Sequence, residues 1–123
     1  KMISLYSIRI PPFSTNHTQI IANHTAWEDT QKREKIEQIA LLLQGALRGE
    51  KLVGLKMNVP KEKIEAVMAL LPSLNAPTVS PLYQSDWFAV EAMMETGVMR
   101  DLIPRLIKAG AEGIIEYPLN KAI

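Results

Sequence analysis

The sequence predicts an α+β fold, in which one antiparallel sheet carries two helices on a single face. From residue 51 onward, segments with the two-residue period of strands alternate with helical segments in the order β-α-β-β-α-β. The second and third of these strands are separated by YQSD, residues 83–86, which is too short for a parallel crossover. This order is typical of the ferredoxin-like split β-α-β arrangement, whose two helices pack on one face of the sheet.

A strand and a long helix precede this unit. The apolar run TQIIAN at residues 18–23 predicts the strand, and Thr25 with Glu28 three residues later predicts a capped start of the helix. Gly49 is expected to end the helix at about Arg48. The apolar residues of the helix follow helical spacing and form one stripe, which we expect to pack against a neighbouring chain. They are Ile36, Ile39, Ala40, Leu43, Ala46 and Leu47.

Prolines, glycines and alternation delimit the elements of the C-terminal unit. Pro60 is expected to open the first helix at its first turn, and Gly110 to close the second helix. Pro104 lies inside that second helix, where it removes a hydrogen bond and costs ~3 kcal/mol, so we expect a kink or a late start. The predicted strands are residues 51–58, 76–82, 86–94 and 113–118, and the predicted helices are residues 60–71 and 98–109.

The composition is that of one soluble domain, or of one domain and part of another, since 47% of the 123 residues are hydrophobic and 22% are charged. No cysteine occurs, which excludes disulfides and thiolate metal sites. The net charge is +1 and basic residues are interspersed, so a nucleic-acid partner is disfavoured. There is no apolar run of roughly 18 residues and no signal-peptide pattern, so we expect a cytoplasmic protein without a membrane partner. Because the chain begins at Lys1, we expect a fragment or a processed chain.

The second predicted strand of the unit is unusual because Pro77 and Pro81 bracket the hydroxyl residues Thr78 and Ser80. Proline cannot donate to a strand ladder, so the two prolines indicate an edge strand or a bulge. Alternation also separates the side chains that face the helices from those on the opposite face. The opposite face is half small and polar and half apolar, which suits a surface covered by another subunit or one that holds a small polar ligand. Its members are Lys56, Asn58, Thr78, Ser80, Ala89, Glu91, Met93, Gly113 and Ile115.

Three runs of the C-terminal part are specific in combination: LKMNVPKEKIEAVMALLPSLNAPTVSPL, DWFAVEAMM and LIPRLIKAGAEGIIEYPLNKAI. Together they resemble the C-terminal regulatory domain of the long-form ATP phosphoribosyltransferases. TQIIAN and LLQGALRGE resemble the last strand and last helix of the catalytic portion in that family, whereas residues 1–17 show no family motif. The resemblance implies two domains: a remnant of the catalytic domain over residues 1–50, and a ferredoxin-like histidine-binding regulatory domain over residues 51–123.

The resemblance also implies an allosteric role. Enzymes of the family are transferases that join ATP to phosphoribosyl pyrophosphate in the first step of histidine biosynthesis. Their regulatory domain assembles hexamers and binds L-histidine as a feedback inhibitor near subunit contacts. By motif, the positions that line the histidine pocket of the family fall on Asn58, Leu74, Ala76, Pro77, Thr78, Met93 and Gly113.

Catalysis is not expected of this chain alone. The phosphoribosyl pyrophosphate site of the family has an acidic pair followed by a loop with threonine and glycine, and no such stretch occurs here. We therefore predict no catalytic residue, no metal site and no cofactor in this chain. The resemblance implies magnesium for the parent enzyme only.

The chemistry of the predicted site fits free histidine, whose ammonium, carboxylate and imidazole groups all need hydrogen-bond partners. Asn58 and Thr78 can donate and accept, Gly113 permits a close backbone approach, and Leu74 and Met93 can flank the ring. Each has a plainer interpretation: Asn58 as a helix cap, Thr78 as an ordinary strand hydroxyl, and Met93 as core. The alternative function is a ferredoxin-like assembly module with no small-molecule ligand. A nucleic-acid-binding domain of this fold would need paired aromatic and basic residues on the sheet face opposite the helices.

Overall fold

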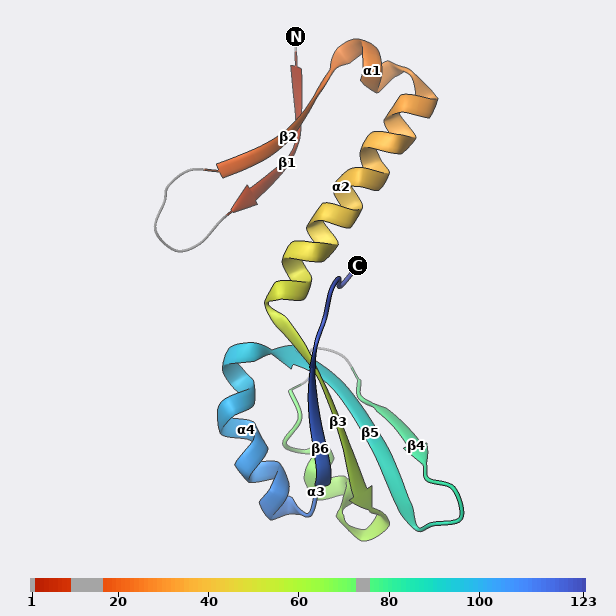
Figure 1. The fold of residues 1–123 in the computed structure, drawn as a ribbon, viewed down its shortest axis with the longest axis vertical. Helices are drawn as coiled ribbons and strands as arrows, with labels where there is room; N and C mark the ends of the chain where they lie inside the picture. Colours follow the sequence, from red (N-terminus) through yellow and green to blue (C-terminus); the bar gives the residue numbers. More distant parts are fainter. Residues whose placement is uncertain (1, 10–16, 73–75) are drawn as a thin grey trace. The chain divides into compact units, whose positions relative to one another are not determined.

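The structure is a computed structural model that describes residues 2–9, 17–72 and 76–123 (Figure 1). The chain divides into two compact units, Lys1–Arg48 together with Ile123, and Gly49–Ala122. None of the helices within the described ranges is long and apolar enough to cross a membrane.

The N-terminal unit begins with two antiparallel strands, β1 (Met2–Arg9) and β2 (His17–Asn23). Strand β2 confirms the strand predicted at residues 18–23, whereas β1 was not predicted. The apolar residues of MISLYSIR do not alternate strictly, so its period does not indicate a strand. The backbone pairing has a register shift between Ser4 and Tyr6, and a shift of this kind interrupts the regular two-residue period of a strand.

The helix predicted to start at Thr25 is two helices, α1 (His24–Glu28) and α2 (Thr30–Glu50). Asn23, not Thr25, caps the first, because its Oδ1 accepts a hydrogen bond from the Ala26 amide at 2.7 Å. Asp29 then starts the second helix: its Oδ1 accepts from the amides of Gln31 and Lys32, at 3.1 and 3.2 Å. The short polar side chains of Asn and Asp compete with the helix for backbone amides, and here they set both helix starts.

Helix α2 is long, but few of its side chains are covered. Ala40 is fully buried, whereas Ile39 and Leu43 of the predicted apolar stripe are 50% and 47% exposed. The packing of this stripe against a neighbouring chain stays a prediction, which sedimentation of the chain at increasing concentration would test. Gly49 was predicted to end the helix, but it lies within the last turn of α2. A Cβ at this position would be 2.9 Å from the Leu119 carbonyl oxygen. The glycine therefore allows a close backbone approach inside the C-terminal unit.

The C-terminal unit contains a four-stranded sheet in the order β4-β5-β3-β6, with every neighbouring pair antiparallel (Figure 1). This order and these directions confirm the predicted α+β, ferredoxin-like β-α-β-β-α-β fold. Strand β4 lies at one edge, as Pro77 and Pro81 predict. The strands are β3 (Leu52–Pro60), β4 (Thr78–Pro81), β5 (Trp87–Glu95) and β6 (Glu112–Pro118).

The first helical segment of this unit is shorter than predicted. It consists of a 3-10 turn, η1 (Lys61–Lys63), followed by α3 (Ile64–Met68). Pro60 was predicted to open a helix, but it is the last residue of β3, where it pairs with Trp87. The next amide, from Lys61, donates to the Asp86 carbonyl at 3.0 Å, which extends the strand pairing and delays the helix.

The second helix, α4 (Thr96–Ala109), begins two turns before Pro104. Of the predicted kink or late start, the late start is wrong and the kink stays a prediction. Its first residue is tied to the start of β3, since the amide and Oγ1 of Thr96 both donate to the Lys51 carbonyl, at 3.1 and 3.3 Å. Gly110 ends the helix as predicted, with a φ of +107° that glycine adopts without strain.

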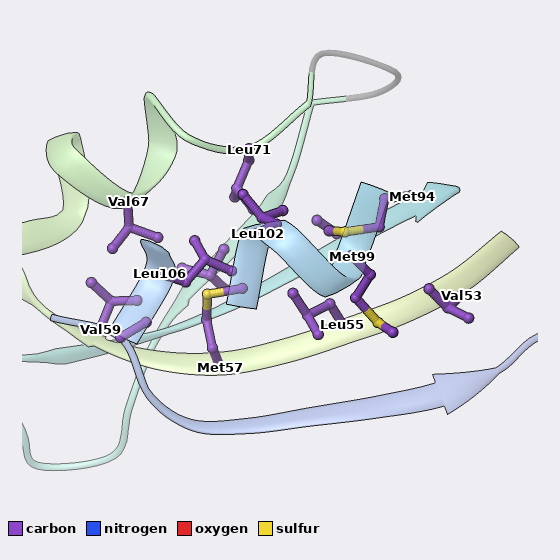
Figure 2. Close-up of a cluster of buried hydrophobic side chains, with 13 residues drawn as sticks. Val53, Leu55, Met57, Val59, Val67, Leu71, Met94, Met99, Leu102 and Leu106 are labelled. Carbon is purple, nitrogen blue, oxygen red and sulfur yellow. The ribbon is translucent and has the colours of Figure 1, made fainter. Parts of the chain in front are cut away.

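The core lies between the two helices and one face of the sheet (Figure 2). Alternate residues of β3 point into it, and the side chains of Leu55, Val59, Val67 and Leu106 are completely buried. Val79, which alternation also places toward the helices, stays 39% exposed because β4 is an edge strand. The buried cluster is Val53, Leu55, Met57, Val59, Val67, Leu71, Val90, Ala92, Met94, Met99, Leu102, Leu106 and Ala111.

Candidate functional site

The sheet face opposite the helices carries the residues that alternation assigns to it. Strand register places Glu91 of β5 opposite both Thr78 of β4 and Lys56 of β3, and Ala89 opposite both Ser80 and Asn58. The side chains that alternate with this set, such as Met57 and Val90, are buried under the helices. We call this surface the open face.

The open face is hollowed at its centre into a depression of about 250 Å³. Three predicted site residues, Asn58, Thr78 and Gly113, line it together, although they come from three different strands. Clefts that hold drug-sized ligands measure roughly 300–1,000 Å³. The depression is smaller than these, so it suits a smaller ligand, of amino-acid size. Its lining residues are Lys56, Met57, Asn58, Thr78, Ser80, Ala89, Val90, Glu91, Gly113 and Ile115.

The other predicted site residues do not line this depression. Met93 lies on the same face opposite Gly54, one step further along β5, and is 42% exposed. Ala76 and Pro77 lie in the segment that enters β4, with Ala76 exposed and Pro77 half-buried. Leu74 lies outside the described residues.

Gly113 is the residue of a β-bulge. On β6, Ile115 pairs with Lys56 and Glu112 pairs with Asn58, so β6 has one residue more than β3 between these pairs. Gly113 takes up this extra residue with a φ of +58°, which side chains disfavour. A Cβ there would have ordinary contact with Asn58 Nδ2, at 3.6 Å. Among the protein atoms, the glycine is therefore needed for its backbone conformation rather than for space. The close approach of a ligand to its backbone stays a prediction.

Asn58 is a strand residue and not a helix cap. It lies in β3 and pairs with Ala89 of β5, and no side chain caps η1 or α3 among the described residues. The Asn58 side chain is exposed at the depression, and in the described part of the chain neither its amide nor the Thr78 hydroxyl has a hydrogen-bond partner. Both groups are therefore free to bind a ligand.

A charged cluster crosses the open face beside these two residues. The Tyr117 hydroxyl of β6 donates a hydrogen bond to Oε1 of Glu91. The Tyr117 ring passes directly over Gly54, because a Cβ on that glycine would lie 2.1 Å from the ring carbon Cζ. Lys56 Nζ is 3.8 Å from Glu91 Oε1 and 5.4 Å from the centre of the Tyr117 ring.

This environment keeps Tyr117 protonated. The hydrogen bond to Glu91, then burial, then the negative charge of Glu91 raise the pKa of Tyr117 to about 12. The phenol therefore keeps its proton, and the hydrogen bond that it donates to Glu91, above the pH at which a free tyrosine ionises.

Sequence reasoning placed Lys56 and Glu91 on this face but missed the role of Gly54 and Tyr117. Alternation along β3 and β6 assigns both residues to the open face. Their contact depends on the register between β3 and β6, in which Gly54 pairs with Tyr117 after the bulge. A glycine opposite an aromatic residue is the signal that could have indicated it.

Comparison with known proteins assigns the C-terminal unit to a protein family. A family model described as "HisG, C-terminal domain" matches residues 49–121, which is more than half of the chain. The chain belongs to this family. The HisG C-terminal match coincides with the unit that contains the sheet and the open face.

Full-length relatives of this HisG C-terminal family member are named ATP phosphoribosyltransferase. The protein from Desulfosudis oleivorans is 64% identical over 122 residues, 98% of this chain and 42% of the relative. The protein from Solidesulfovibrio magneticus is 66% identical over 110 residues, 89% of this chain and 37% of the relative. The chain thus spans about two fifths of the length of these curated relatives. Because the first of these matches covers 98% of this chain, it extends into residues 1–17, for which no family motif was expected.

Proposed function

We propose that the C-terminal unit binds L-histidine in the depression of the open face and thereby gives feedback inhibition of an ATP phosphoribosyltransferase. The parent enzyme would be a cytoplasmic transferase that joins ATP to phosphoribosyl pyrophosphate in the first step of histidine biosynthesis. The names of the full-length relatives support this parent activity. In this proposal, residues 1–50 belong to the catalytic portion and the C-terminal unit regulates it.

The observation that carries the proposal is a pair of polar side chains at the depression that have no hydrogen-bond partner among the described residues. The Asn58 amide and the Thr78 hydroxyl have no partner among the described residues, and they offer donors and acceptors to the same depression from β3 and β4. Buried polar groups of a ligand need such partners, since each unpaired one costs ~1–3 kcal/mol. The imidazole and the α-carboxylate of histidine would take these positions.

The parent enzyme would form hexamers and use magnesium at its catalytic site. Among the described residues, no group of three or more histidines and carboxylates lies together as a candidate metal site. The metal would belong to the larger catalytic part, and no step of histidine binding depends on it.

Calorimetric titration of the chain with L-histidine and, separately, with L-arginine tests the proposal. We expect binding heat with histidine and none with arginine. At 100 times the dissociation constant, histidine should also add ~2.7 kcal/mol to the free energy of unfolding. Equal heats for the two amino acids, or no heat for either, would contradict histidine binding.

A second candidate function is an assembly module without a small-molecule ligand. The exposed apolar residues of the open face favour it, because Ile115 is 60% exposed and Met93 is 42% exposed. Sedimentation would separate the two functions. Association that removes the open face from solvent and is unaffected by histidine would support assembly alone.

A further inference from the structure

Glu91 occupies the centre of the open face. It lies on β5, between Thr78 on one neighbouring strand and Lys56 on the other, and it lines the depression with both. Asn58 and Thr78 are neutral, whereas Glu91 adds a full negative charge to the same depression. The predicted site residues do not include it.

The carboxylate of Glu91 is anchored through one oxygen only. Oε1 accepts the hydrogen bond from Tyr117 and is the oxygen that lies 3.8 Å from Lys56 Nζ. Oε2 has no hydrogen bond or ion pair with any residue in the described parts of the chain. A carboxylate has about four acceptor positions, so the second oxygen is open to a ligand while the first holds the group in place.

Two features of the chain keep this arrangement rigid. Gly54 leaves room for the Tyr117 ring to cross β3, which a Cβ at 2.1 Å from the ring would prevent. The Tyr117 hydroxyl holds Oε1 of Glu91 in place, and this hydrogen bond is the main cause that raises the pKa of Tyr117 to about 12. A side chain whose orientation is already set loses less entropy when it binds a ligand.

We propose that Glu91 is a specificity-determining residue, whose Oε2 accepts the α-ammonium of a bound amino acid. This inference rests on the proposed histidine site and names the group that selects an amino acid over its uncharged analogues. An ammonium–carboxylate hydrogen bond is about twice as strong as a neutral one, so the ammonium is the ligand group that gains most at Glu91. Lys56 pairs with Glu91 across β3 and β5 and lines the same depression, and it has the charge that suits the α-carboxylate.

Titration of the full chain with three ligands tests the proposal. L-histidine has both charges, imidazole lactate has a hydroxyl in place of the ammonium, and histidinol has an alcohol in place of the carboxylate. We expect Glu91→Gln to weaken binding of histidine and of histidinol by roughly 10- to 100-fold. Binding of imidazole lactate should change little, so the preference for histidine over this analogue should collapse.

Tyr117→Phe provides a second variant, in case Glu91→Gln does not fold. It keeps the charge of Glu91 but removes the anchor on Oε1, so Tyr117 is tested as a positioning residue. We expect a loss of about 2- to 10-fold for histidine, with a matching fall in the preference over imidazole lactate. A purely structural role of Tyr117 would weaken all three ligands equally.

Glu116→Gln is the matched control. Glu116 is an exposed carboxylate on β6 that pairs with Leu55 and lies outside the depression, so all three affinities should stay unchanged. If wild-type chain binds histidine and the Glu91→Gln variant keeps the preference for histidine over imidazole lactate, the proposed role of Glu91 is wrong. The histidine site itself is then unaffected. If wild-type chain binds none of the three ligands, the histidine site and this inference are both overturned.

Discussion

The two longest helices of the chain use their apolar residues differently. Helix α4 buries Met99, Leu102 and Leu106 against the sheet of its own unit. Helix α2 is seven residues longer, 21 against 14, yet Leu41, Leu42 and Leu43 are each more than 40% exposed. Length and apolar content therefore do not indicate which helix is stabilised, since most helical stability in proteins comes from tertiary packing.

The two units can be followed separately, because each contains one of the two tryptophans. Trp27 lies in the N-terminal unit, with the guanidinium carbon of Arg33 4.4 Å from its ring centre, and Trp87 lies on β5. Replacing either tryptophan by phenylalanine leaves one fluorescent reporter. This matters because two units need not unfold in a single transition.

Leu106→Ala should have the largest effect on stability. Leu106 is completely buried, so truncation leaves a cavity and should lower the free energy of unfolding by about 2–5 kcal/mol. Leu43→Ala, at a site that is 47% exposed on α2, should cost only about 0.5 kcal/mol. Denaturant unfolding followed by Trp87 and by Trp27, respectively, measures both. Equal losses would mean that α2 is packed as closely as α4.

Gly54→Ala should have the next largest effect. The new methyl group would overlap the Tyr117 ring, and such overpacking costs about 1–3 kcal/mol. The cost should fall in a Tyr117→Ala background, because the two residues compete for the same space. Chemical denaturation of the two single variants and the double variant measures this coupling. Additive losses would show that the ring does not lie over Gly54.

Asp29→Ala should destabilise the start of α2 by about 0.5–2 kcal/mol, because two backbone amides lose the carboxylate that caps them. Asp29→Asn is the matched control, since asparagine caps equally well. Hydrogen exchange of the first turn of α2 should rise in the alanine variant only. A similar rise in the asparagine variant would argue for a role of the charge instead.

The last and smallest expected effect is the loss of the stability that Tyr117 contributes, which should appear only at alkaline pH. Its folded pKa of about 12 is above the ordinary value of 10.0, so folding favours the protonated phenol. The stability that this gives is fully present below pH 10 and is lost as the pH rises from 10 to 12. The ultraviolet absorbance of tyrosinate, compared between wild type and Tyr117→Phe, measures the titration. If the absorbance difference between wild type and Tyr117→Phe titrates near pH 10, Tyr117 has an ordinary pKa, which would contradict the hydrogen bond to Glu91.

The sequence alone determined the C-terminal fold, because several local signals agreed. Alternation along residues 51–58, the short YQSD connection and Gly110 each pointed to the same sheet and helices, and proline placed β4 at the edge. The same alternation assigned Asn58, Thr78 and Gly113 to one face, which the structure confirms. Local signals suffice here because the period of a strand decides which face each side chain occupies.

Only the tertiary structure decided the features that depend on register and on competing caps. The helix starts at Asn23 and Asp29 could not be separated from Thr25 by pattern, since all three residue types cap helices. The contact between Gly54 and Tyr117 joins residues that are 63 positions apart, as 117 minus 54 shows, and it follows from a bulge at Gly113. A bulge shifts every later pair by one residue, so the position of Tyr117 over Gly54 and beside Glu91 is fixed by the folded sheet and not by local sequence.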